Sequence, residues 1–289
     1  MAELDDIQTT HQKFLDFLKN QKRAHATILA YGKDIDQLAK FSNERGKKAV
    51  NEITKDDLTA FLAKLEKDGY TAKSISRKIN SIKTFYRFLR TNGFSKVDVA
   101  DEISHPKYDV KPPRILSKLE YRALRDACRD DARISAVVEL LLQTGIRIGE
   151  LANLRLEDID QKTGEIRIRP YESHEGRTIP LNRPVNAALE RYIKSRPQSD
   201  NPILFITKTG RPLLIRNIRT AIDRYFRLAD IKDVKVNDLR HTFIAHHLMS
   251  GAPLTLISRL VGHKRLSTTE KYLDIIKDKV QENVKLEEL

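Results

Sequence analysis

The chain has 289 residues, and its 53 lysines and arginines outnumber 40 aspartates and glutamates, which leaves a formal net charge of +13. This length allows two domains with cores of their own, and the positive excess favours a polyanionic partner, above all nucleic acid, although some basic proteins bind none. A single cysteine excludes an intramolecular disulfide, and the lack of metal-ligand motifs, glycine-rich phosphate loops and long apolar runs predicts a cytoplasmic protein without metal, cofactor or membrane span.

Residues 1–103 predict a domain made of helices only. Apolar residues recur at helical spacing in three stretches, and Thr54 is the expected N-cap of the second. The third stretch, TAKSISRKINSIKTFYRFLR, also carries basic and small hydroxyl side chains away from its apolar stripe: Lys73, Ser74, Arg77, Lys78 and Ser81. Small hydroxyls allow close approach and cations supply charge, so this set predicts a phosphate-binding face. An ordinary solvated helix face is the alternative.

Residues 104–114, SHPKYDVKPPR, predict the linker between two domains. Its three prolines prevent a continuing helix and favour an extended chain. The basic residues suit a strap along DNA, and a purely mechanical linker is the alternative.

Residues 115–289 predict a second domain of helices and a small β-sheet. Ser117 with Glu120 predicts a capping box, and RISAVVELLLQTG predicts a buried helix that ends at Gly145. GEIRIRPYESHEGRTIPL predicts two strands around a turn, and ILFITKTGRPL predicts a further strand. Helices are expected near 184–196, 215–229 and 237–250, and in LTLISRLVG and STTEKYLDII.

The last residues, LDIIKDKVQENVKLEEL, predict an amphipathic tail helix. Its apolar stripe comprises Leu273, Ile276, Val280, Val284 and Leu286. Such a stripe packs either on its own domain or on a neighbouring copy of the chain.

Four polar residues of the second domain together suit phosphodiester chemistry without a metal. Arg147 follows the Gly145 turn, and Arg240, His263 and Tyr272 follow at wide spacing. Arginines neutralise the charge of a phosphorane-like transition state, a histidine donates to a phosphate oxygen, and a tyrosine hydroxyl is a nucleophile that can hold a phosphate covalently. Taken singly, each residue also fits an ion pair, a cap or simple packing.

Three segments that contain these residues resemble the boxes of a known family. TGIRIGEL, LRHTFIAHHL and LVGHKRLSTTEKY resemble those of the tyrosine recombinases, or phage integrases, of the compact Xer-like branch, which includes transposon-encoded resolvases. The resemblance covers essentially the whole chain. It implies a mainly α fold with a small β-sheet, in which residues 1–103 form a helical SAM-like DNA-binding domain and residues 115–289 a mixed α+β catalytic domain.

The resemblance also implies the activity and the partners. Strands would be cut and rejoined through a 3′-phosphotyrosine and a Holliday junction, by a homo-tetramer on two double-stranded DNA sites with inverted repeats. The tail would dock in trans, and the protein would be associated with the nucleoid. Chromosome-dimer resolution, transposon resolution and element integration fit equally.

By the same resemblance, Arg147 and Arg240 clamp the phosphate, His263 donates to it, Tyr272 attacks it and His241 supports the site. Two positions depart from the family pattern. Asn237 stands where the family has histidine or lysine, and it can bind phosphate but cannot act as a general base.

The family's hairpin lysine, the general acid for the leaving 5′-oxygen, has no counterpart between residues 163 and 181. Arg169, His174 or Lys208 could replace it. The departures keep open a DNA-binding protein of the same fold with weak or lost cleavage, and a type IB topoisomerase-like enzyme that relaxes DNA is a further alternative.

Overall fold

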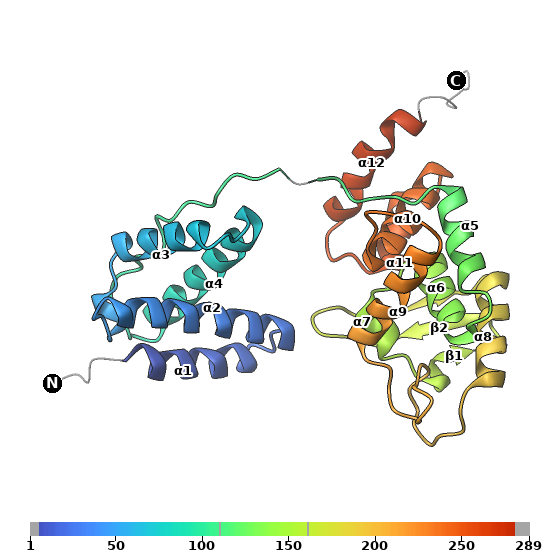
Figure 1. Cartoon of the computed structure of the whole chain (residues 1–289), viewed down its shortest axis with the longest axis horizontal. Coiled ribbons are helices and arrows are strands. Elements are labelled where there is room, and N and C mark those ends of the chain that lie inside the picture. Colours follow the sequence, from blue (N-terminus) through green and yellow to red (C-terminus); the bar gives the residue numbers. More distant parts are fainter. Residues whose placement is uncertain (1–5, 110, 161, 281–289) are drawn as a thin grey trace. The chain divides into compact units, whose positions relative to one another are not determined.

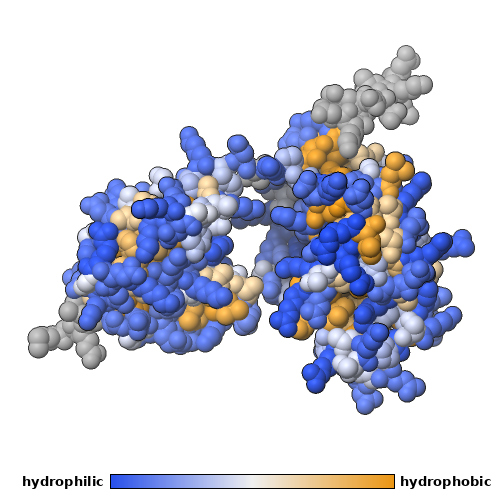
Figure 2. Space-filling view, in the orientation of Figure 1, coloured by the Kyte–Doolittle hydropathy of each residue, from blue (hydrophilic) through white to orange (hydrophobic). Residues whose placement is uncertain are grey.

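The computed structural model describes residues 6–109, 111–160 and 162–280, the last three by their backbone only. The chain divides into two compact units, Met1–Val110 and Lys111–Leu289 (Figure 1). In the view of Figure 2 the surface of each unit is mostly hydrophilic, with small apolar patches between the charged side chains. None of the described helices is long and apolar enough to cross a membrane.

The first unit is a bundle of four α-helices around an aromatic core. The helices are α1 (Ile7–Asn20), α2 (His25–Glu44), α3 (Lys55–Lys67) and α4 (Ala72–Thr91), with a 3-10 turn, η1 (Val50–Glu52), before α3. Rings of Phe14 and Phe85 meet edge to face at 5.2 Å between centroids. Thr54 caps α3 as predicted: its hydroxyl accepts from the Asp57 amide at 3.3 Å, and the Asp57 carboxylate accepts from the Thr54 amide at 2.8 Å.

The phosphate-binding face predicted on α4 is partly wrong. Two of the five predicted residues are buried inside the first unit. Lys78 is 5% exposed and Ser81 is 0% exposed. The Lys78 ammonium donates to Asp34 at 2.9 Å and to Gln37 at 2.7 Å on α2, and the Ser81 hydroxyl donates to the Tyr31 carbonyl at 3.4 Å. Helix α2 covers this side of α4, so these polar groups serve packing.

The other three residues of that set are nearer the surface. Lys73 is exposed and Ser74 is half-buried. Arg77 is exposed and also forms an ion pair with Asp34. Of the predicted cations, therefore, only Lys73 and Arg77 lie on the outward face of α4.

The second unit packs helices around a three-stranded antiparallel sheet of order β1-β2-β3. The strands are β1 (Ile159–Asp160), β2 (Glu165–Ile168) and β3 (Arg177–Pro180), with Ile166 opposite Ile179. The helices are α5 (Lys118–Ala127), α6 (Ala132–Thr144), α7 (Ile148–Ala152), α8 (Arg183–Ser195), α9 (Ile215–Leu228), α10 (Val236–Met249), α11 (Leu254–Val261) and α12 (Ser267–Val280), with a 3-10 turn, η2 (Leu156–Asp158), before β1. The predicted fold class, mainly helical with one small sheet, is confirmed.

Helix α6 is the centre of this unit, because nearly every side chain along it is buried. It packs against α8 and α10, and it ends at Gly145 as predicted, with φ of 61°. A Cβ at this position would lie 2.5 Å from Cδ1 of Phe243 on α10. Only glycine allows both this backbone conformation and this close approach, which brings the segment after α6 against α10.

The strand predicted in ILFITKTGRPL does not form; the described residues there make only isolated bridges, Arg155 with Ile203 and Ile206 with Pro212. Its backbone groups bond partly to scattered backbone partners, such as the Leu204 amide to the Leu154 carbonyl at 2.7 Å, and partly to side chains. The Tyr192 hydroxyl donates to the Leu204 carbonyl at 3.0 Å and accepts from the Ile206 amide at 3.2 Å. A backbone whose groups bond to scattered partners and to side chains has fewer groups left for a continuous strand ladder.

The tail helix is described only in part. Tyr272 and Ile276 of α12 are buried in a small cluster with residues of α10 and α11. Val284 and Leu286 lie outside the described residues, as does the side chain of Val280.

Candidate active site

Arg147 connects the end of α6 to the end of α11. It is the residue before α7, and its backbone amide donates to Glu150 at 2.8 Å. Its guanidinium donates to Glu150 at 3.0 Å and to the carbonyls of Val261 at 3.2 Å and Gly262 at 2.7 Å. These bonds hold Arg147 beside the turn that carries His263.

Glu150 and Arg177 form a buried pair behind Arg147. The two guanidinium nitrogens of Arg177 donate to the two carboxylate oxygens at 2.9 and 2.8 Å, and its Nε donates to the Leu260 carbonyl at 2.6 Å. Burial alone raises the pKa of Glu150, but the bonds and charge of Arg177, aided by Arg147, lower this pKa to about 2. Arg177 was missed by the sequence reasoning, since an arginine at the start of a strand carries no local signal.

Arg240 is a buried cation on α10. It is 6% exposed, and its guanidinium donates to the Gly145 carbonyl at 2.5 Å. Burial, with the positive charge of Arg147, lowers the pKa of Arg240 to about 9, which leaves it charged at neutral pH. Within the part of the chain that the structure describes, no carboxylate hydrogen-bonds this guanidinium, so its remaining donors are free for an anion.

His263 follows Gly262, which ends α11 in the left-handed conformation with φ of 69°. Its Nδ1 lies 2.8 Å from the hydroxyl of Thr269, a buried residue of α12. Burial, with the positive charges of Arg240 and Arg147, lowers the pKa of His263 to about 4. His263 is therefore neutral at physiological pH and stacks near the Tyr272 ring, at 6.4 Å between centroids.

Tyr272 is 6% exposed, and its hydroxyl lies 2.5 Å from Nδ1 of His241 on α10. The other ring nitrogen of His241 lies 2.7 Å from the side-chain amide of Asn237. Burial raises the pKa of Tyr272, and the positive charge of Arg240 opposes this rise. The sequence predicted Asn237, Tyr272 and, by resemblance, a supporting role for His241, but it did not predict that His241 lies between the other two.

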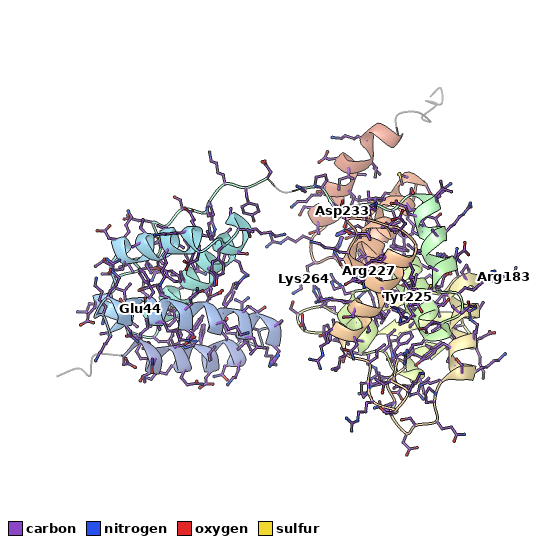
Figure 3. The ribbon with its side chains drawn as sticks, in the orientation of Figure 1. Glu44, Arg183, Tyr225, Arg227, Asp233 and Lys264 are labelled. Carbon is purple, nitrogen blue, oxygen red and sulfur yellow. The ribbon has the colours of Figure 1, made fainter. Side chains whose placement is uncertain are left out.

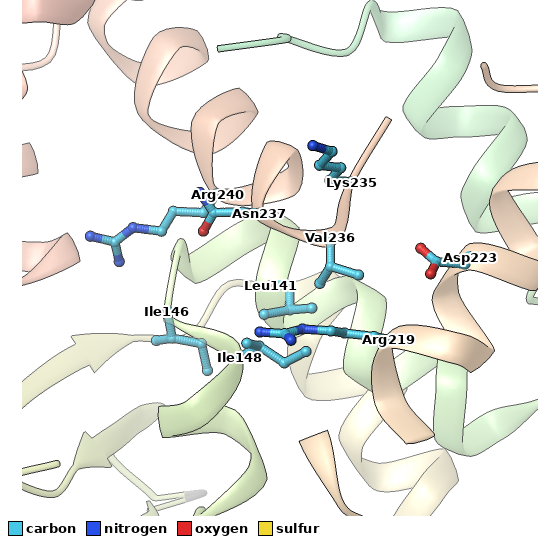
Figure 4. A pocket seen from close by; sticks show the side chains of 9 residues that line it. All are labelled: Leu141, Ile146, Ile148, Arg219, Asp223, Lys235, Val236, Asn237 and Arg240. Carbon is cyan, nitrogen blue, oxygen red and sulfur yellow. The ribbon is translucent and has the colours of Figure 1, made fainter. Parts of the chain in front are cut away.

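Two cavities border this network. One of about 370 Å³ is lined by Asn237, Arg240, Lys235 and Arg219, with Asp223 as the one acidic residue among its lining (Figure 4). The other, of about 530 Å³, lies beside the β2–β3 hairpin and is lined by residues that include His174, Arg177, His263 and Lys264; Lys264 is labelled in Figure 3. Both are basic, which suits a polyanion.

The three candidates for the missing hairpin lysine differ in their surroundings. Arg169 is held by Asp158 at 2.8 Å and Glu157 at 2.7 Å. Lys208 lies in the turn of residues 207–210, which lines neither cavity. His174 lines the larger of these two cavities, and its buried Nδ1 has no hydrogen-bond partner among the described residues. Burial, followed by the charge of Arg147, lowers the pKa of His174.

The residues predicted from the sequence are thus brought together from distant segments. Contacts link Arg147, His263, Tyr272 and Asn237 through the Gly262 carbonyl, ring stacking and His241, and the charge of Arg240 acts on Tyr272 and His263. Lys73, Ser74 and Arg77 lie on the separate first unit. Among the described residues, no three histidine, cysteine, aspartate or glutamate side chains gather as ligands for a metal ion.

Comparisons with known proteins agree over most of the chain. Residues 114–278 match the phage integrase family, and residues 12–93 match the phage integrase N-terminal SAM-like domain. Tyrosine recombinase XerC of Oceanobacillus iheyensis is 31% identical, over 96% of this chain and 95% of that protein.

Solved structures have the same fold. A crystal structure of XerA recombinase is 26% identical with a TM-score of 0.55, over 97% of this chain and 100% of that one. The Tn1549 transposon integrase in complex with transposon right end DNA has a TM-score of 0.79 at 17% identity, over 96% and 99% of the two chains.

Proposed function

This chain is a tyrosine recombinase of the phage integrase family, and on that premise we propose that it cuts and rejoins DNA at specific sites through a 3′-phosphotyrosine at Tyr272. The observation that carries the assignment is the buried guanidinium of Arg240, which no carboxylate of the described residues hydrogen-bonds and whose charge acts on Tyr272. Burying a cation without an anionic partner costs free energy, and a bound anion offsets this cost. A DNA phosphate is that anion.

The arginines act on the phosphate, and the tyrosine acts on its phosphorus. Arg147 and Arg240 are held by backbone carbonyls at 2.7 and 2.5 Å, so their positions are set before DNA arrives. Preorganised donors of this kind stabilise the charge that develops on the non-bridging oxygens. His263, neutral and fixed by Thr269, donates from its second ring nitrogen to the same phosphate.

The covalent step conserves the energy of the phosphodiester bond. The Tyr272 oxygen attacks, the bond to the 5′-oxygen breaks, and a 3′-phosphotyrosine holds the strand. Attack by a 5′-hydroxyl reverses this step and restores the tyrosine. Exchange of strands between two duplexes therefore proceeds through a Holliday junction without a nucleotide cofactor.

Double-stranded DNA with an inverted-repeat site is the proposed partner, gripped by both units. On the first unit, Lys73, Ser74 and Arg77 supply phosphate contacts from the outward side of α4. Lys78 and Ser81 support that helix from inside. A homo-tetramer on two sites, located at the nucleoid in the cytoplasm, completes the proposal.

Covalent trapping tests this function. Wild-type protein is mixed with nicked duplexes of random sequence, and DNA that stays attached after denaturation is sequenced. We expect one enriched sequence with inverted repeats, and no attachment by Tyr272→Phe despite nearly unchanged DNA binding, since removal of one hydroxyl leaves the phosphate contacts intact.

Other outcomes identify the alternatives. Binding without any attachment would indicate a DNA-binding protein that has lost cleavage. Attachment without sequence preference, together with relaxation of any supercoiled plasmid, would indicate a topoisomerase.

A further inference from the structure

Two hydrogen bonds in series link Tyr272 to His241 and His241 to Asn237. The phosphate contacts proposed above do not use either bond. The Tyr272 hydroxyl lies 2.5 Å from Nδ1 of His241, and Nε2 of His241 lies 2.7 Å from the amide nitrogen Nδ2 of Asn237. Asn237 and His241 are one helical turn apart on α10, so they share a face. Tyr272 reaches them from α12, with its ring centroid 5.8 Å from that of His241.

The chemistry of these groups decides the direction of the bonds. A neutral imidazole has one donor nitrogen and one acceptor nitrogen. Burial lowers the pKa of His241, so the ring is neutral at physiological pH. Tyr272 before attack carries an O–H, which needs an acceptor, and Nδ1 of His241 is the one beside it. Nε2 then carries the ring proton. The Asn237 atom beside it is the amide nitrogen Nδ2, which only donates, so this tautomer requires the Asn237 amide turned by 180°, with its oxygen accepting from Nε2–H.

We propose that His241 takes the proton of Tyr272 during attack on DNA, and that Asn237 holds His241 in the tautomer that can take it. This inference rests on the proposed function, since it concerns the nucleophile of that reaction. His263 is unsuited to the same task because its Nδ1 is bound to Thr269. Asp238 is also engaged, because its carboxylate accepts from the Lys235 amide at 2.7 Å.

Each proton that moves in the reaction has a named donor and acceptor. As the bond between Tyr272 and phosphorus forms, its proton passes to His241 Nδ1, giving an imidazolium with both N–H groups directed at oxygen atoms. The leaving 5′-oxygen takes its proton from a separate donor, water or a side chain of the β2–β3 hairpin. In the reverse step His241 returns the proton to the departing tyrosine oxygen.

This role explains why an amide suits position 237. A lysine there would donate to Nε2 and force the proton onto Nδ1, which could then accept nothing from Tyr272. An aspartate would still accept from Nε2–H and preserve the tautomer. A leucine would leave the tautomer unspecified. These three variants therefore separate the tautomer from simple packing.

The test follows the rate of covalent attachment to the selected nicked duplex in single turnover, from about pH 5 to pH 9. The charged and titratable groups around His241 are Asp238, Arg240, His263 and Tyr272, and all stay unchanged in the His241 variant. Wild-type attachment should rise about tenfold per pH unit up to the pKa of His241 and then level off.

His241→Gln should attach at least about 10²-fold more slowly near pH 7, with a rate that keeps rising with pH because tyrosine must ionise unaided. Asn237→Asp should stay within a few-fold of wild type, whereas Asn237→Leu and Asn237→Lys should lose roughly tenfold or more. The matched control is His247→Gln, a half-buried histidine of α10 that packs on Phe243, and it should keep the wild-type profile. A His241→Gln profile with the wild-type shape, however slow, would overturn the proposal.

Nitrogen NMR of the free protein gives a readout that needs no DNA. We expect His241 with a protonated Nε2 and an unprotonated Nδ1, and loss of this preference in Asn237→Lys. A protonated Nδ1 in the wild-type protein would overturn the relay even if attachment to DNA is observed. If wild-type protein attaches to no DNA, the proposed function fails, and the NMR result still decides the tautomer.

Discussion

Glu150 and Arg177 face each other in parallel, Oε1 to Nη1 at 2.9 Å and Oε2 to Nη2 at 2.8 Å, and both side chains are buried. Glu150 also receives the backbone amide and the guanidinium of Arg147. One carboxylate therefore holds α7, β3 and Arg147 together. Arg177 in turn bonds to the Leu260 carbonyl near the end of α11, so the pair positions both sides of the site.

Loss of the Glu150 charge should destabilise the catalytic unit. Glu150→Gln leaves the buried Arg177 without its anion, and we expect the free energy of unfolding to fall by roughly 3–5 kcal/mol. Scanning calorimetry of the full chain measures this. The control is Glu157→Gln, which removes an exposed partner of Arg169 and should change stability by less than about 1 kcal/mol. Equal effects of the two variants would contradict the role of the pair.

Because the pKa of Glu150 is lowered on folding, the catalytic unit should lose stability in acid. The pKa of Glu150 in the folded chain is about 2, below the value of about 4.3 for an unfolded glutamate. Its contribution is therefore complete above about pH 4.3 and is lost as the pH falls toward 2. In calorimetry, Glu150→Gln should show a smaller decline across this range than the wild type. Parallel declines would refute this assignment.

Gly145→Ala should impair folding and attachment more than a matched glycine variant. Gly145 combines a φ of 61° with a Cβ position 2.5 Å from Phe243. Gly164 has a φ of 67°, and a Cβ added there would meet no heavy atom of the described residues within 4 Å, its chain neighbours aside. Gly164→Ala therefore meets only the backbone penalty, about 1–2 kcal/mol. Gly145→Ala adds displacement of α10, which carries Arg240. Melting temperature and covalent attachment distinguish the two, and similar losses would show that contact with Phe243 is unimportant.

His174 is the predicted source of the proton for the leaving 5′-oxygen. It lines the cavity that also contains His263, and a bound phosphate would offset the positive charge of Arg147 that helps to lower the pKa of His174. A substrate with a 5′-bridging sulfur needs little protonation. His174→Gln should thus slow attachment to normal DNA by roughly 10²-fold and hardly affect the sulfur substrate. Arg169→Gln and Lys208→Gln serve as controls, and equal losses on both substrates would exclude His174.

Substitution of Lys73 should weaken DNA binding, whereas substitution of Lys78 should lower stability, although both residues are on α4. Lys73→Ala removes an exposed cation, so DNA binding should weaken and its dependence on salt should decrease by about one phosphate contact. Lys78→Ala leaves buried Asp34 with one cationic partner fewer, so the unit should lose roughly 1–3 kcal/mol of stability. Salt titrations and calorimetry decide between these effects. A reduced salt dependence in Lys78→Ala without loss of stability would contradict its buried placement.

Local signals in the sequence determined much of this protein. The Ser117–Glu120 box, the cap at Thr54 and the end of α6 at Gly145 all formed as predicted, because each depends on residues within one helical turn. The order of the boxes with Arg147, Arg240, His263 and Tyr272 identified the family, which the comparisons confirmed.

Only the tertiary structure decided which groups meet. Helical periodicity shows that Lys78 is off the apolar stripe of α4, but not that α2 brings Asp34 against it. Likewise, spacing cannot show that Arg177 reaches Glu150, or that Tyr272 of α12 reaches His241 of α10. Such pairs join residues from separate elements, and their geometry depends on how those elements pack.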